Sequence, residues 1–116
     1  MTRALVALFC VWAVFAWAAP PPGANGQFGD WFRSLNHPDG YSCCDLSDCR
    51  MVRVRYTPNG YEALLTPETH DVPEPTWVVV PLAKIITPET GNPTGMAVVC
   101  WTPARGVLCF VRPPEI

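Results

Sequence analysis

The middle of the chain alternates between apolar and polar positions with the two-residue period of a β-strand. In "RMVRVRYTPNGYEALLT" the apolar residues Val52, Val54 and Tyr56 alternate with the residues between them. The letters "TPNG" then supply a proline and glycine turn before a second apolar segment, "YEALL". We therefore predict a hairpin whose arginines, Arg53 and Arg55, face water, where they are also a candidate anion-binding pair.

Two further segments predict the rest of a sheet. The run "TWVVVP" fits a buried strand that ends at Pro81, and a single helical turn follows around Leu82 to Ile85. The segment "AVVCWTPARGVLCFV" fits a second hairpin, whose apolar arms flank the turn residues "TPARG". A turn centred on the letters "AR" places Cys100 opposite Cys109.

Upstream of the sheet, the segment "DWFRSLNHPDG" predicts one short helix from Trp31 to Asn36. Asp30 is a favourable N-cap residue, and the proline and glycine at the end of the segment terminate the helix. Because Trp31, Phe32 and Leu35 fall on one helical face, we expect that face to dock on the rest of the domain.

These elements together predict the fold class. Five strands of about five or six residues, one short helix and 14 prolines describe a mainly β protein. We predict a small antiparallel sheet or barrel of about five strands with one short N-terminal helix, braced by disulfides.

The first letters, "MTRALVALFCVWAVFAWAAPPPG", have the layout of a secretory signal peptide: an early positive charge, an apolar run and a proline cluster. Ala16 and Ala18 supply the small residues for cleavage after Ala18. As a helix the run spans about 24 Å, less than the roughly 30 Å of a bilayer core, so a retained membrane anchor is the weaker alternative. We predict a signal peptide (1–18), a flexible tether (19–28) and one small domain (29–116), periplasmic or secreted.

The charge of the mature chain excludes one class of partner. Residues 19–116 contain seven basic and ten acidic residues, and Lys84 is the only lysine. A net charge of −3 offers no electrostatic footprint for nucleic acid. We therefore expect no nucleic-acid partner.

The cysteines of the mature chain predict a disulfide framework, because a small exported domain has little core to stabilise it. Two bonds and one remaining thiol is the simplest arrangement. A bond between adjacent cysteines is strained, and a Cys100 to Cys109 bond could bridge the last hairpin. We favour at least one long-range bond, which would tie the N-terminal segment to the sheet. The candidates are Cys43, Cys44, Cys49, Cys100 and Cys109.

The segment "SCCDLSDC" also suggests other chemistry. Its acceptable ligands for zinc or cuprous copper are Cys43, Cys44, Cys49, Asp45, Asp48 and the nearby His37. However, the segment lacks the paired C-x-x-C spacing of a structural zinc site, and its aspartates would raise thiol pKa values, which opposes thiol catalysis. We expect the segment to hold the chain together, with the aspartates capping backbone amides, and we predict no metal or cofactor.

The sequence contains no recognisable catalytic set. His37 and His70 are the only histidines, and both lie beside turn prolines or loop acids, where we expect solvated side chains. No Ser/His/Asp combination can be placed, so we predict no catalytic residue and regard a hydrolase as the least supported function.

The segments "DWFRSLNHPDGYSCCDLSDCR", "WVVVPLAKII", "NPTGMAVVCW" and "LCFVRPPE" resemble a group of small exported alphaproteobacterial proteins that has no assigned activity. The likeness covers nearly the whole mature region. Its most specific part is Cys-Cys-Asp-x-x-Asp-Cys followed by a C-terminal Cys-Phe-Val. The resemblance implies export and a shared fold, and it implies no catalytic residues.

Two functions remain open from the sequence. The first is a non-enzymatic envelope module that binds a protein or glycan through exposed aromatic side chains. The second is a metal-handling or thiol-redox protein that uses the Cys43 to Cys49 cluster. Exposed tryptophan and tyrosine would favour the first, whereas several free thiols with bound metal would favour the second.

Overall fold

The computed structural model describes residues 28–114. The predicted signal peptide, and the predicted tether except for its last residue, lie outside the described residues. Phe28, at the end of the tether, packs against the core beside the first helix.

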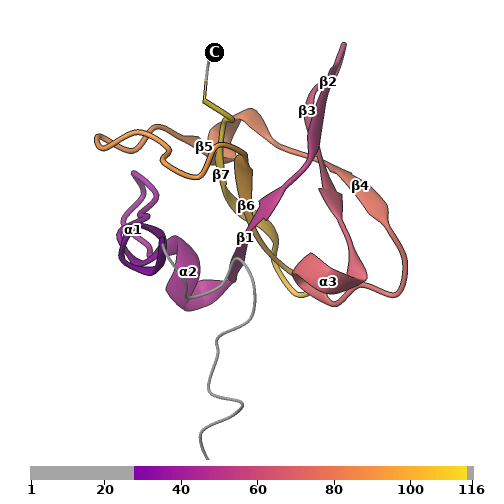
Figure 1. Cartoon of the computed structure of the whole chain (residues 1–116), viewed down its shortest axis with the longest axis horizontal. Coiled ribbons are helices and arrows are strands. Elements are labelled where there is room, and N and C mark those ends of the chain that lie inside the picture. Colours follow the sequence, from indigo (N-terminus) through magenta and orange to yellow (C-terminus); the bar gives the residue numbers. More distant parts are fainter. Residues whose placement is uncertain (1–27, 115–116) are drawn as a thin grey trace, which may run out of the picture.

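Seven strands and a few short helices make up the described chain, which confirms the mainly β fold class (Figure 1). The strands form a four-stranded sheet of order β1-β6-β7-β5 and a three-stranded sheet of order β2-β3-β4. None of the described helices has the length and apolar character needed to cross a membrane. The elements are α1 (Gly29–Arg33), α2 (Cys43–Leu46), β1 (Asp48–Val52), β2 (Val54–Thr57), β3 (Gly60–Leu65), α3 (Pro67–His70), β4 (Thr76–Val79), the 3₁₀ helix η2 (Leu82–Lys84), β5 (Ile85–Ile86), β6 (Ala97–Thr102) and β7 (Gly106–Val111).

The four-stranded sheet lies in the middle, and apolar side chains cover both of its faces. Phe32 and Leu35 pack on one face with Val98 and Cys100 of β6, and the three-stranded sheet packs on the other face against Val99. Figure 1 shows α1 and α2 on one side of β6 and β7, with β2, β3 and β4 on the other. Because successive side chains of β6 point to opposite buried layers, its sequence "AVVC" is continuously apolar.

Both predicted hairpins are confirmed. β2 pairs antiparallel with β3, and β6 pairs antiparallel with β7. In the first turn Gly60 has a φ of 102°, a conformation that residues with a Cβ rarely adopt. The predicted first strand is divided at Arg53 into β1 and β2, which belong to different sheets, and the two-residue β5 adds a parallel pair with β7.

The predicted N-terminal helix is shifted. We expected Trp31 to Asn36 with Asp30 as N-cap, but α1 begins at Gly29, and Phe28 occupies the N-cap position without a side-chain cap. Asp30 therefore lies in the first turn, where its carboxylate pairs with Arg33. The apolar face docks as expected, since Phe32 is buried and the indole N–H of Trp31 donates to the Gly91 carbonyl at 2.9 Å.

The prediction that "TWVVVP" forms a buried strand is wrong. The segment does form β4, but β4 lies at the edge of the three-stranded sheet. Trp77 and Val79 remain 38% and 53% exposed, and only Val80, after the strand, is buried. An apolar run indicates a strand without indicating which of its faces a neighbour covers, and here the outward face of β4 stays open to solvent.

Candidate functional site

Two disulfides connect the N-terminal cysteine segment to the central sheet. Cys43 on α2 bonds to Cys109 on β7, and Cys49 on β1 bonds to Cys100 on β6. Both bonds are long-range, as we favoured, with sequence separations of 66 and 51 residues. Two disulfides indicate an oxidising, non-cytoplasmic environment.

The proposed Cys100 to Cys109 bond does not form, although the two residues are directly opposite in the β6–β7 register. Their side chains point into the layer between the sheet and the helices. In that layer Cys109 meets Cys43 and Cys100 meets Cys49, which is also its direct cross-strand partner in β1. Each hairpin cysteine is therefore bonded to a cysteine from another element, Cys43 of α2 or Cys49 of β1, and not to the cysteine opposite it in the hairpin.

Cys44 is the one described cysteine that forms no disulfide, which confirms the expected arrangement of two bonds and one thiol. Its side chain is half-buried, and the thiol donates to the Phe32 carbonyl at 2.9 Å. Burial, followed by the negative charge of Asp45, raises the pKa of the Cys44 thiol to about 11, although Arg50 acts in the opposite direction. The thiol is therefore protonated at neutral pH and is a weak nucleophile.

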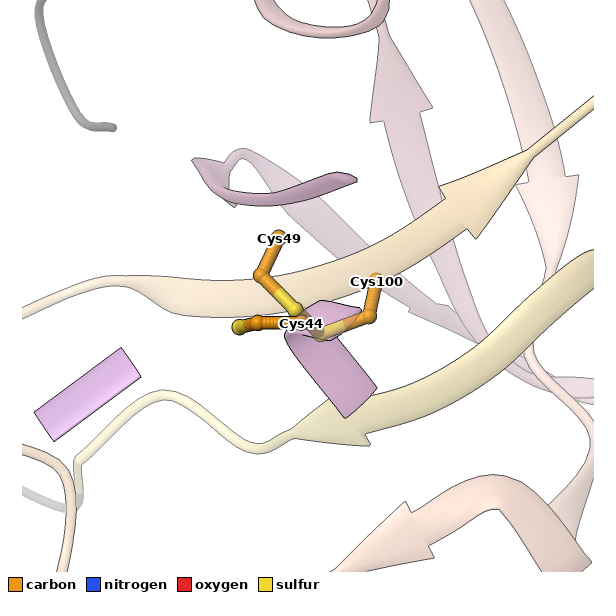
Figure 2. Close-up of side chains that lie close together, drawn as sticks. All are labelled: Cys44, Cys49 and Cys100. Carbon is orange, nitrogen blue, oxygen red and sulfur yellow. A yellow bond between two sulfur atoms is a disulfide. The ribbon is translucent and has the colours of Figure 1, made fainter. Parts of the chain in front are cut away.

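The Cys44 thiol lies beside the Cys49–Cys100 disulfide, and we call these three side chains the sulfur cluster. Their sulfur atoms all lie within 4.8 Å of one another. Figure 2 shows Cys44 from α2, Cys49 from β1 and Cys100 from β6 gathered at one point. The sequence could not reveal this grouping, because Cys100 is 51 residues from Cys49.

The other predicted ligands do not join the sulfur cluster. Asp45 and Asp48 are exposed, and the Ser42 hydroxyl, rather than an aspartate, caps α2 by accepting from the Asp45 amide. His37 lies elsewhere, stacked on the Tyr41 ring with centroids 4.7 Å apart.

The expectation that both histidines are solvated is wrong. His37 and His70 are buried, and each ring is held by a distant backbone carbonyl. His37 Nε2 lies 2.7 Å from the Ala83 carbonyl oxygen, and His70 Nε2 lies 3.0 Å from that of Asp48. Burial lowers the pKa of His70. His37 therefore connects the loop after α1 to η2, and His70 connects α3 to the start of β1.

The second candidate site is the open side of the three-stranded sheet, which we call the outer face. The strand register places Arg55, Glu62 and Val79 in one row, and Leu64 beside Trp77 in the next. Arg53 lies opposite Leu64, whose amide donates to its carbonyl. The predicted exposure of both arginines is confirmed. The outer face consists of Arg53, Arg55, Glu62, Leu64, Trp77 and Val79.

Charge and aromatic contacts order the centre of the outer face. The Arg55 guanidinium lies 4.1 Å from the centroid of the Trp77 ring. The same guanidinium makes an ion pair with Glu62, with 2.7 Å between Nη2 and Oε1. Arg53 makes no ion pair within residues 28–114. The face therefore combines exposed apolar surface with one guanidinium that has no counter-charge.

Exposed apolar side chains also occur behind the hairpin tip. Tyr56 and Leu82 are 75% and 83% exposed, and they border a groove of about 340 Å³ together with Tyr61 and Arg112. The Tyr56 ring packs edge-on against Tyr61, with ring centroids 4.9 Å apart. Apolar residues are therefore exposed on both sides of the small sheet.

Comparisons with protein-family models, with curated proteins and with solved structures find no match to this chain.

Proposed function

We propose that the protein is a non-enzymatic module of the cell envelope, periplasmic or secreted after removal of a signal peptide, that binds a partner protein through its outer face. The observation that supports this most directly is the exposure of Trp77 and Val79 beside Arg53 and Arg55. Aromatic residues and arginine are enriched at protein interfaces and supply most of the residues that dominate binding energy. Trp77 and Val79 belong to neither core cluster of the described residues, so the core does not require apolar side chains at these two positions.

The contacts of Trp77 favour a protein over a glycan. A sugar ring would stack on an open indole face, but the Arg55 guanidinium covers one face of Trp77. A partner protein can bind without displacing Arg55, because the exposed part of the Trp77 indole and Val79 offer apolar contact. Arg53 would pair with a carboxylate. The expected partner segment therefore combines apolar and acidic side chains.

The backbone of β4 offers the same partner a place to pair. The Val80 amide donates to the Tyr61 carbonyl, so the amides of Trp77 and Val79 point away from β3. In the described chain no strand lies on that side, since β4 ends the sheet order. An extended segment could add to this edge and place its side chains on the outer face.

Site-directed photocrosslinking in intact cells tests the proposal. A photoreactive phenylalanine derivative at Val79 should give one discrete protein adduct. The same group at Glu68, an exposed residue of α3, should give none. Arg53→Glu in the Val79-labelled chain should abolish the adduct by reversing the charge. Identical products from both positions, an adduct that survives Arg53→Glu, or binding only to isolated wall glycan would contradict the proposal.

A second candidate function is thiol-redox or metal-handling chemistry at the Cys43 to Cys49 segment. The observation in its favour is the Cys44 thiol within 4.8 Å of both sulfurs of a disulfide. The raised pKa of Cys44 opposes the thiol-redox form, because little thiolate is available at neutral pH. Mass spectrometry of the exported protein separates the two functions: two disulfides without metal support the binding module, whereas three or more thiols with stoichiometric metal support metal handling.

A further inference from the structure

The sulfur cluster would have a different chemistry if its disulfide were opened. We propose that the protein binds one cuprous ion through the thiolates of Cys44, Cys49 and Cys100 once the Cys49–Cys100 bond is reduced. This inference gives the second candidate function a chemical form. It is independent of the outer face, with which it shares no residue, so either proposal can fail alone.

The distances suit a three-coordinate site. Metal–sulfur bonds of about 2.3 Å in a trigonal arrangement place the sulfurs about 4 Å apart. The three sulfur atoms already lie within 4.8 Å of one another. Only the bonded sulfurs of Cys49 and Cys100 must move apart, which reduction of the bond allows. Small side-chain rotations would therefore form the site.

The backbone holds the three ligands in place after reduction. Cys49 and Cys100 are partners in a five-pair antiparallel ladder between β1 and β6, whose hydrogen bonds do not depend on the disulfide. The Cys43 amide donates to the Leu35 carbonyl at 3.0 Å, and α2 packs against α1 and β1, so the adjacent Cys44 is held whether or not the Cys43–Cys109 bond is intact. The fold therefore holds the three ligands close together before the ion binds, which lowers the entropy cost of binding.

The donor set selects the metal. Three thiolates form a soft ligand set, and no imidazole or carboxylate of residues 28–114 lies in the same group. Zinc sites in proteins almost always have four ligands, whereas soft sulfur ligands select Cu(I). Cys49 and Cys100 are buried, so an ion would enter from the half-buried Cys44. Asp45 and Asp48 act on Cys44 with two negative charges against the one positive charge of Arg50, which favours a cation.

The chemistry requires an external dithiol. The dithiol gives two electrons and two protons to the Cys49–Cys100 bond, the S–S bond breaks to two thiols, and the dithiol becomes a disulfide. Copper binding then forms three Cu–S bonds and releases the thiol protons to solvent, while copper remains Cu(I).

Competition with a coloured Cu(I) chelator tests the inference. Dithiothreitol opens both disulfides, so the purified protein is reduced in trimethylamine N-oxide, which keeps the reduced chain folded. It is then freed of the dithiol by anaerobic gel filtration in the same osmolyte and titrated into the Cu(I)–bicinchoninate complex. The reduced protein should remove one Cu(I) per chain, and the unreduced protein none. X-ray absorption at the copper edge should show three sulfur neighbours.

Variants identify the ligands. Cys44→Ser should weaken Cu(I) binding by about 100-fold or more, since even second-shell changes cost 10- to 100-fold. Cys43→Ala with Cys109→Ala removes two other cysteines and should retain the binding, and circular dichroism shows whether each reduced chain stays folded. Equal loss in both variants, copper uptake by the unreduced protein, or Zn(II) binding in place of Cu(I) would overturn the proposal.

Discussion

Removal of both disulfides should destabilise the protein by more than the two separate removals added together. The Cys49–Cys100 loop lies inside the Cys43–Cys109 loop, so each bond shortens the loop that the other closes. The perturbations are paired alanine substitutions of one bond, of the other and of both. Alanine is chosen because all four cysteines are buried.

The size of the effect follows from the loop lengths. In the chain-entropy treatment, one bond across 51 or 66 residues contributes about 4 kcal/mol to the free energy of unfolding. When the inner bond, Cys49–Cys100, is present, the outer bond, Cys43–Cys109, closes a shorter ring. This ring contains the seven residues from Cys43 to Cys49 and the ten from Cys100 to Cys109. A ring of about 17 residues is worth about 3 kcal/mol, so both bonds contribute about 7 kcal/mol. Loss of one bond should cost about 3 kcal/mol, and loss of both about 7 kcal/mol.

Urea unfolding followed by circular dichroism measures these differences, with the free energy obtained by linear extrapolation. A trimethylamine N-oxide background keeps the least stable variant folded, because this osmolyte is excluded from the protein surface. The cost of removing both bonds should exceed the summed costs of the single removals by about 1 kcal/mol. A double removal that costs no more than that sum would refute the nested-loop reasoning.

Three further outcomes are expected. Iodoacetamide should modify Cys44 slowly at neutral pH, with a rate that rises up to a pH of about 11, because burial raises its pKa; modification at pH 7 as fast as in the urea-unfolded chain would contradict this. His70→Gln should cost less stability at pH 5 than at pH 7.5. Burial lowers the pKa of His70 in the folded state, so the fold favours the neutral imidazole. The contribution of His70 to the free energy of unfolding is therefore lost as the pH falls below the pKa of histidine in the unfolded chain, about 6.5. If the free energy of unfolding, measured in urea, differs between wild type and His70→Gln by the same amount at both pH values, the predicted pH dependence is wrong. Phe110→Ala should cost about 3–5 kcal/mol, because Phe110 is fully buried in the layer between the two sheets; a thermal midpoint within 2 °C of wild type would exclude that core position.

The hairpins could be predicted because their information is local. The letters "TPNG" and "TPARG" each supply turn residues between apolar arms, and a short turn sets the strand register. Cys100 does lie opposite Cys109, but the turn closes with Thr102 opposite Gly106, and a register shift between Cys100 and Trp101 produces the predicted pair. The error in the disulfide pairing came from the next step, since the partners Cys43 and Cys49 come from elements far away in the sequence.

The environment of individual side chains could not be predicted in the same way. His37 and His70 stand next to turn residues, yet both side chains are buried. Each ring also contacts one backbone carbonyl from a distant segment. Trp77 and Val79 stand in an apolar run, yet they lie on a sheet face that stays open. In each case burial depends on which element packs above the residue, and periodicity within one segment contains no information about that element.

The division of the first strand has the same origin. The alternation from Met51 to Tyr56 predicts one continuous strand, but the chain leaves the first sheet at Arg53 and enters the second. The period-two pattern continues across the change of sheet, because Val52 and Val54 both face the layer between the two sheets while Arg53 and Arg55 are exposed. The sequence therefore predicted the segments, and the structure supplied their arrangement in two sheets.

Disulfide mapping of the purified, unreduced protein tests the central claim most directly, because the fold, its stability and the sulfur cluster all depend on the same pairing. Proteolysis without reduction, after alkylation of accessible thiols in denaturant, followed by mass spectrometry, should yield peptides linked through Cys43 to Cys109 and through Cys49 to Cys100, with Cys44 alkylated. A peptide linked through Cys100 to Cys109, or Cys44 in any disulfide, would contradict the account.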